Sequence, residues 1–379
     1  MSDPKTSALK SSGLAGITAG SSAISQVDPT GDKLTYRGYD AHELAENACF
    51  EEVAFLLVMG HLPSQEEFKE FNQTLVNERK VSREVMELFT KLPVEAHPMD
   101  RLRTAVSFSA LFDPDRGDSS HEANVRKAFR LIAKMPALVA GSFLVPQNKD
   151  LVESKSEFSW AKHFLILLRG EEPDDEAVRV FDASLILYAE HGFNASTFAG
   201  RVTMGTLSDI YSGVTSSIGT LKGPLHGGAN EKAMEMLIEI GEPEKAEAWV
   251  REALAQKKKI MGFGHRVYKV QDSRAPLLKK LNKQYSEKLG NMKWYEIADI
   301  VEKILKEEKN LFPNVDFPCA SLYYLLGLPV EVYTPIFAAA RTAGWCAHDI
   351  EQSDNNRLIR PECDYVGERD LKYIPLENR

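Results

Sequence analysis

Apolar residues recur at helical spacing along almost the whole chain, whereas the alternating pattern of a half-buried strand is nearly absent. In one segment, Val178, Phe181, Leu185 and Tyr188 form a single stripe that stops at Gly192, a residue type that often follows the end of a helix. The pattern predicts a mainly α-helical fold, and 379 residues leave room for more than one domain.

Two further segments carry local signals for the start of a helix. Ser64 and Glu67 form the capping-box pattern before an apolar stripe. Thr334 and Pro335 precede the alanine-rich segment that contains Arg341. We expect helices to begin at these two places, with Ser64 and Thr334 as their caps.

The β-like pattern is confined to residues 22–40, SAISQVDPTGDKLTYRGYD, where two short runs flank a Pro-Thr-Gly-Asp turn. It predicts a short N-terminal β hairpin. Further along, the turn-rich stretches KGPLHGG and NVDFPCAS bracket roughly a hundred residues of helical pattern, a reasonable size for a small domain that could move as a hinge.

The expected organisation has two parts. We predict a large helical domain, a small helical domain, and a return to the large domain that ends in a C-terminal arm, over residues 1–222, 223–320 and 321–379 respectively.

Charge and cysteine usage restrict the class of protein. The net charge of −9 argues against a nucleic-acid partner or a membrane surface, because both attract a basic face. The N-terminus does not resemble a signal peptide, and we expect no stretch to reach the apolar length of a membrane span. The cysteines lack paired or metal-ligand spacing, which predicts free thiols and a cytoplasmic location; they are Cys49, Cys319, Cys346 and Cys363.

Two histidines stand among glycines. His226 lies in KGPLHGG and His265 in MGFGHRV, where glycine allows the backbone to approach a ligand closely. A histidine near a turn is more often a solvated or capping residue, so one such loop is weak evidence, but two are harder to dismiss. The G-x-G before His265 has neither the third glycine nor the βαβ unit of a dinucleotide fold.

Asp316 and several arginines are the remaining candidates for chemistry. Asp316 is either a helix cap or an enclosed carboxylate, and Arg341 would be costly to bury without an anionic partner. The other arginines singled out are Arg274, Arg357 and Arg360. With the histidines, these residues indicate acid–base chemistry on a small polycarboxylate, although they do not identify the reaction.

Six motifs resemble the citrate synthase family in order and spacing: AEHGFNASTFAGRV, GPLHGGANE, MGFGHRVYK, DSRAP, the segment around Asp316, and NNRLIRP. The resemblance runs from AISQVD to PECDYVGERD, which is nearly the whole chain. It implies a mainly α-helical homodimer with a large and a small domain in each subunit. It also implies condensation of acetyl-CoA with oxaloacetate, followed by hydrolysis of the thioester.

The resemblance implies a role for each matching residue. Asp316 corresponds to the base that removes the acetyl methyl proton, His226 to the histidine that hydrogen-bonds the enol or enolate, and His265 to the one that polarises the oxaloacetate ketone. The residues that match the dicarboxylate binders are His191, Arg274, Arg341 and Arg360. In the family the segment around Arg360 reaches across the dimer, so each active site is expected to be shared.

Coenzyme A is implied as part of a co-substrate, with no metal and no permanently bound cofactor. The residues that match its binding loop are Lys259, Ile260, Met261, Gly262 and Phe263. An alternative for the lysines at 257–259 is the solvated C-terminal end of a helix, where cations favour the helix dipole.

Two other functions stay open from the sequence. A 2-methylcitrate synthase would use propionyl-CoA with the same catalytic residues, and one methylene in an apolar pocket changes the free energy by only about 1–3 kcal/mol, so both activities can coexist. A helical interaction protein without catalysis is opposed by the intact candidate residues. The chain leaves no room for an added N-terminal regulatory domain, which makes control by NADH unexpected.

Overall fold

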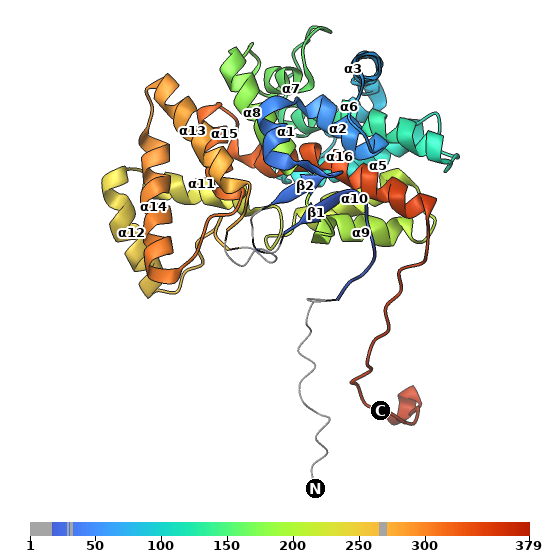
Figure 1. The fold of residues 1–379 in the computed structure, drawn as a ribbon. Helices are drawn as coiled ribbons and strands as arrows, with labels where there is room; N and C mark the ends of the chain where they lie inside the picture. The colour runs from blue at the N-terminus through green and yellow to red at the C-terminus, as the bar shows by residue number, and fades with distance from the viewer. Residues whose placement is uncertain (1–16, 29, 31–32, 265–270) are drawn as a thin grey trace.

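A computed structural model describes residues 17–28, 30, 33–264 and 271–379. Within these residues the fold is built from α-helices and one small antiparallel sheet, as the sequence predicted (Figure 1). The helices are α1 (Ala41–Asn47), α2 (Phe50–Met59), α3 (Gln65–Glu78), α4 (Arg83–Phe89), α5 (Pro98–Ser109), α6 (His121–Leu144), α7 (Trp160–Arg169), α8 (Asp175–Tyr188), α9 (Ala195–Met204), α10 (Ile210–Leu221), α11 (Ala229–Ile240), α12 (Pro243–Ala255), α13 (Ala275–Leu289), α14 (Lys293–Lys309), α15 (Asp316–Leu325) and α16 (Tyr333–Asp354). Short 3-10 helices are η1 (Ala110–Phe112), η2 (Val145–Gln147), η3 (Val330–Val332) and η4 (Leu376–Asn378).

The N-terminal sheet has one strand more than the predicted hairpin. Strand β1 (Ser25–Val27) pairs with β2 (Leu34–Tyr36), and β2 pairs in turn with β3 (Tyr39–Asp40). Arg37 and Gly38 both have positive φ, so the chain reverses within two residues and adds the short third strand.

Helix α16 forms the centre of the fold. Every residue from Tyr333 to Ile350 is buried, and the helix packs against α2, α6, α8, α9 and α10. Helices α11 to α15 pack mainly against one another, with α13 also against α8, and they gather on one side of the molecule in Figure 1. The residues after α16 run away from the helical body as an extended segment.

The predicted helix boundaries are partly correct. Ser64 caps α3 through the expected capping box, in which the Glu67 side chain accepts from the backbone N–H of Ser64 at 2.8 Å. Thr334 is not the cap of α16: the helix begins one residue earlier, and the backbone N–H of Thr334 donates to Glu231 Oε1 at 3.0 Å. The tertiary partner replaces the local cap.

The end of α8 also differs from the prediction. The helix stops at Tyr188, and Gly192, with φ of 57°, lies in the turn beyond it. Within that turn, the backbone N–H of Gly192 donates a hydrogen bond to the side chain of the buried Glu190. The helix therefore ends about one turn before the glycine that was expected to follow it.

One expectation about apolar length was wrong. The helix over His121–Gln147 is long and apolar enough to cross a membrane by composition, but 72% of its apolar window is buried inside the protein. Such burial is typical of a core helix. The four cysteines are free, as the sequence predicted.

Burial of an acidic side chain predicts how stability depends on pH. Glu51 on α2 is buried, and its Oε1 accepts from the backbone N–H of Trp160, whereas Oε2 has no hydrogen-bond partner among the described residues. Burial raises the pKa of Glu51. The folded protein therefore favours the protonated carboxyl, and ionisation at higher pH costs stability.

We expect Glu51→Gln, which keeps the acceptor but cannot ionise, to raise the melting temperature at pH 8 by about 2 °C. The gain should fade as the pH falls towards the unfolded pKa of about 4.3. Thermal unfolding of the parent and variant between pH 4.5 and 8 measures this. Glu70→Gln, at an exposed position of α3, is the matched control. A variant less stable than the parent at pH 8 contradicts the interpretation.

Candidate active site

The last carbonyl groups of α8 bind two buried arginines. Arg274 Nη1 donates to the carbonyl of Leu187 at 3.5 Å, and Arg341 Nε donates to the next carbonyl, that of Tyr188, at 2.6 Å. Terminal helix carbonyls have no partner within their own helix and lie at its negative end. Both cations therefore meet at one helix terminus.

Arg341 lies on the central helix α16 and is only 1% exposed. Its guanidinium stands over the ring of Phe337, 4.9 Å from the centroid. Burial lowers the pKa of Arg341 to about 10, and the negative charge of Glu190 opposes that shift. Among the described residues, Nη1 has no hydrogen-bond partner, so an anion could bind there.

Arg274 precedes the first residue of α13 and is also buried. Its Nε and Nη2 donate to the two carboxylate oxygens of Asp272 at 2.9 and 2.8 Å. Asp272 Oδ2 in turn accepts from the backbone N–H of Val315 at 3.0 Å. This fork fixes Arg274 and ties it to the residue before Asp316.

Asp316 is the first residue of α15 and is 7% exposed. The hydroxyl of Tyr188 donates to its Oδ1 at 2.7 Å. Burial raises the pKa of Asp316 to about 6, although the Tyr188 hydrogen bond and the positive charge of Arg274 oppose the increase. Such a carboxylate is ionised near neutral pH and can accept a proton.

His226 lies in the turn before α11, close to the start of α9. Its Nε2 is 2.8 Å from Ser196 Oγ and 3.2 Å from Asn194 Oδ1. The indole N–H of Trp345 on α16 also donates to Ser196 Oγ, at 3.1 Å. The start of α9 therefore orients the imidazole, and Trp345 of α16 holds Ser196, one of its partners.

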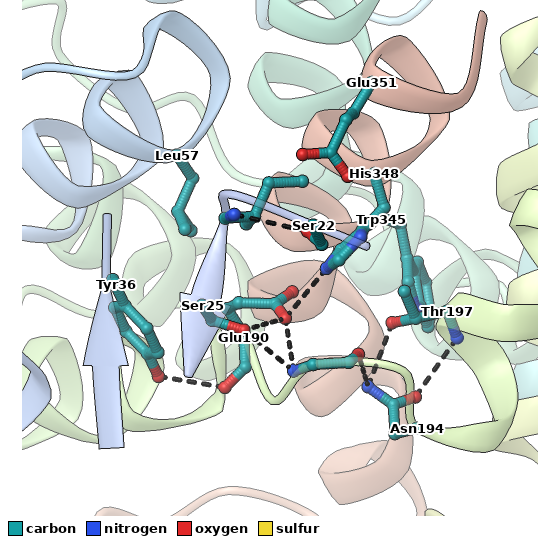
Figure 2. Close-up of polar contacts among 12 residues, drawn as sticks. Ser22, Ser25, Tyr36, Leu57, Glu190, Asn194, Thr197, Trp345, His348 and Glu351 are labelled. Atoms are coloured by element: carbon teal, nitrogen blue, oxygen red, sulfur yellow. Dashed lines mark hydrogen bonds and ion pairs between the residues drawn. The ribbon is translucent and has the colours of Figure 1, made fainter. Parts of the chain in front are cut away.

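His191 is buried in the turn between α8 and α9, between Glu190 and Gly192. Figure 2 shows how the Glu190 side chain gathers polar contacts from the sheet and from α16 around this turn. Hydrogen bonds therefore hold the residues on either side of His191, which are Glu190 and Gly192.

The predicted coenzyme A loop is joined to the segment that carries Asp316. The carbonyl of Gly262 accepts from Asn314 N–H at 2.9 Å, and the rings of Phe263 and Phe317 are 4.5 Å apart. Gly262 has φ of 83°, and a Cβ there would lie 2.8 Å from Phe317. Ile260 and Gly262 are buried, Met261 and Phe263 are half-buried, and Lys259 is exposed.

One predicted site residue, Arg360, lies apart from this group. Arg360 is exposed on the extended segment after α16, and His265 lies outside the described residues. Arg357, the other cation singled out in that motif, is exposed as well. No group of three or more potential metal ligands occurs among the described residues.

Several residues that build the site were missed by sequence reasoning. Tyr188 was assigned only to an apolar stripe, and the importance of Glu190 and Asp272 was not foreseen. Asn194 and Ser196 did carry a signal, because Asn194 begins a capping pattern and caps α9 through the N–H groups of Ser196 and Thr197.

Together these residues place a buried carboxyl that can accept a proton in the same site as two buried arginines, a combination found in enzymes that act on anionic substrates. A model of the citrate synthase family, described as the C-terminal domain of citrate synthase, matches residues 13–362. The chain belongs to the citrate synthase family, and its citrate synthase homologues are acyltransferases that condense acetyl-CoA with oxaloacetate. A role as a non-catalytic interaction protein has no support.

Named relatives carry both activities considered from the sequence. Citrate synthase 2 of Bacillus subtilis is 49% identical over 368 residues, covering 97% of this chain and 98% of its own. A 2-methylcitrate synthase of Mycobacterium tuberculosis is 45% identical over 355 residues, covering 94% of this chain and 90% of its own.

Solved structures agree on the fold. Citrate synthase from Thermotoga maritima superimposes with a TM-score of 0.86 at 38% identity, covering 97% of this chain and 99% of its own. The Thermoplasma acidophilum enzyme, solved as a ternary complex with carboxymethyl coenzyme A and oxaloacetate, gives a TM-score of 0.91 at 33% identity, with coverage of 97% and 99%. The mainly helical fold class is therefore confirmed.

The hydrogen bond to Asp316 leads to a prediction about pH dependence. A reaction that needs Asp316 ionised should lose rate as the pH falls through about 6. Tyr188→Phe removes a donor that favours the ionised form, so the acidic limb of kcat/KM for the acyl-CoA should move about one pH unit higher. A pH series at saturating oxaloacetate measures this shift.

The control for this prediction is Tyr323→Phe, at a second buried tyrosine whose hydroxyl pairs with Ser184 at 3.0 Å. It should leave the acidic limb in place. An acidic limb that stays put or moves to lower pH in Tyr188→Phe would show that this hydrogen bond does not set the titration of Asp316.

Proposed function

We propose that Asp316 is the base that takes a proton from the carbon next to the acyl-CoA thioester. The observation that carries this proposal is a buried carboxyl whose pKa is raised to about 6 and whose Oδ1 accepts from Tyr188. A thioester α-proton is far less acidic than a carboxylic acid. The base can therefore work only if the developing oxyanion is stabilised as it forms.

His226 donates a hydrogen bond to that oxyanion in the proposed mechanism. Its contacts with Ser196 and Asn194 support this role because they fix the ring before substrate arrives. The enolate carbon then attacks the ketone of oxaloacetate, and water later cleaves the thioester to release coenzyme A. Polarisation of the ketone is assigned to His265, on the resemblance alone.

The oxaloacetate carboxylates bind to Arg274, Arg341 and His191 in this proposal. Support comes from the burial of both arginines and from Nη1 of Arg341, which lacks a partner among the described residues. Arginine's planar fork suits a carboxylate, and in a buried site the charge-assisted bonds are strong.

Coenzyme A lies along residues 259–263 in the proposed arrangement, and the protein holds no metal or permanent cofactor. The hydrogen bond from Asn314 N–H to the Gly262 carbonyl supports the placement, because it joins the loop to the segment just before α15. In this arrangement, coenzyme A bound along residues 259–263 would place the carbon next to the thioester close to Asp316.

Acetyl-CoA is the proposed acyl donor, with propionyl-CoA as the alternative. The relatives include both citrate synthases and 2-methylcitrate synthases at similar identity. A single methylene separates the two substrates, so a mixed activity is compatible with one pocket. Release of the thiol from each acyl-CoA, with and without oxaloacetate, measures the preference directly.

The division into a large domain over 1–222 and 321–379 and a small one over 223–320 stays a proposal. It is supported by the mutual packing of α11 to α15. Oxaloacetate would touch Arg341 of the large part and Arg274 of the small part, which favours a closed state when it binds. A cytoplasmic location, without a nucleic-acid or membrane partner, likewise remains a prediction.

We further propose that the protein is a homodimer, in which Arg360 of one subunit binds the substrate carboxylate in the active site of the other. Arg360 is exposed on the segment that leaves the helical body, and the apolar side chains that follow are exposed too, which supports contact with a second subunit. The exposed side chains are Tyr365, Val366, Leu371, Tyr373, Ile374 and Leu376.

Asp316→Asn should abolish release of coenzyme A from acetyl-CoA and from propionyl-CoA, while oxaloacetate binding changes little. The amide keeps the shape but cannot take the proton. A thiol assay gives turnover and calorimetry gives the oxaloacetate affinity. Turnover within tenfold of the parent would exclude Asp316 as the base.

Arg360→Ala and Asp316→Ala should each be nearly inactive, the first through loss of a charge-assisted pair and the second through loss of the base. When the two variants are unfolded and refolded together, about half of the dimers are mixed if assembly is random. Each mixed dimer has one complete site and should regain activity. Confirmed heterodimers without activity above the separate variants would show that Arg360 does not act across the dimer.

A further inference from the structure

Glu190 is a fully buried acidic residue to which the proposed mechanism gives no role. It is 0% exposed and stands directly before His191 in the turn after α8. Burying a carboxylate is costly unless donors and cations compensate for the lost water. The groups around Glu190 therefore show what holds it there.

Three donors from separate parts of the chain meet at Glu190 Oε1. Ser25 Oγ of β1 donates at 2.9 Å and His348 Nε2 of α16 lies at 3.0 Å, while the backbone N–H of Gly192 donates from the turn itself. The hydroxyl of Tyr36 on β2 donates to the Glu190 carbonyl at 3.1 Å. Figure 2 shows these contacts converging on the turn from both sides.

The partners of Glu190 belong to a wider network of polar contacts. Arg201 Nη1 is 3.0 Å from His348 Nδ1 and 2.7 Å from Glu351 Oε2. Glu351 Oε1 accepts from the backbone N–H of Ala23 at 2.8 Å, just before β1. The network thus closes into a ring that joins the N-terminal sheet, the turn and α16.

The second carboxylate oxygen of Glu190 lies against α16. A Cβ at Gly344 would lie 2.3 Å from Glu190 Oε2 and 2.4 Å from the carbonyl of Ala189, so only glycine allows this approach. Arg341 is three residues earlier on the same helix. Burial raises the pKa of Glu190, but the contact with His348 and the positive charge of Arg341 outweigh that effect and lower it.

We propose that Glu190 is a positioning residue, which the N-terminal sheet and His348 hold so that the turn presents His191 to oxaloacetate beside Arg341. This inference rests on the proposed role of His191 and Arg341 as substrate binders. It gives the N-terminal sheet a function, because Ser25 and Tyr36 fasten the turn. Glu190 itself does not touch the substrate.

Glu190→Gln separates positioning from a simple charge effect, since the two have opposite signs. If Glu190 were only a nearby negative charge, its neutralisation would tighten binding of the oxaloacetate dianion. If Glu190 positions the turn, its bonds to His348, Ser25 and Gly192 weaken to about half their strength, and the affinity for oxaloacetate falls. We expect a loss of about tenfold in oxaloacetate affinity, with KM for acetyl-CoA unchanged.

Ser25→Ala provides a second test that does not alter a buried charge. It should weaken oxaloacetate binding about threefold, because one charge-assisted donor is lost. Ser25→Thr keeps the hydroxyl and suits a strand, so it should restore the parent affinity. An effect on thermal stability alone, without a change in oxaloacetate affinity, would overturn the proposal.

A double-mutant cycle with His191→Gln distinguishes the inference from the function on which it rests. If Glu190 acts through His191, Glu190→Gln should cause no further loss of affinity when His191 is already replaced. A His191→Gln enzyme with parental affinity contradicts the proposed substrate-binding role of His191. A different result overturns only the positioning role of Glu190. In that case His191→Gln weakens oxaloacetate binding, whereas Glu190→Gln and Ser25→Ala leave the affinity unchanged or increase it.

Discussion

The C-terminal end of α8 is the point on which the rest of the site depends. Two consecutive carbonyls, those of Leu187 and Tyr188, bind Arg274 and Arg341, and the hydroxyl of Tyr188 binds Asp316. A helix end supplies unpaired acceptors and a partial negative charge without adding another ionisable group. It can therefore hold two cations in a buried site while Nη1 of Arg341, which has no hydrogen-bond partner among the described residues, stays available to a substrate anion.

Burial shifts the pKa values of the charged groups in this site and strengthens the electrostatic interactions between them. Arg341 and Asp316 both have shifted pKa values because water is excluded, the arginine downwards and the carboxyl upwards. Electrostatic interactions strengthen in such surroundings, so fixed donors can stabilise a developing oxyanion without moving. The fork between Arg274 and Asp272 holds that guanidinium in place, and the contacts around Glu190 hold the turn that contains His191.

The sequence predicted the helical class, the capping box at Ser64 and the main catalytic candidates. Periodicity, local caps and motif spacing can all be recognised from the order of residues alone. It did not reveal Tyr188 as a donor, since an apolar stripe reports burial and not the direction of a hydroxyl. The start of α16 also differs from the local pattern, because the N–H of Thr334 donates to Glu231, a residue distant in the sequence. The end of α8 precedes Gly192, where the apolar stripe did not report it. His265 and the contribution of Arg360 across a dimer depend on the family resemblance.

Exchange of the α-protons of acetyl-CoA with deuterated water tests the central claim most directly. An oxaloacetate analogue with a hydroxyl in place of the ketone would occupy the arginines but could not condense, so only proton removal at Asp316 would be observed. If Asp316 is the base, the parent enzyme should incorporate deuterium, detected by mass spectrometry, and Asp316→Asn should incorporate none at equal occupancy of the analogue. Equal incorporation by both proteins would contradict it.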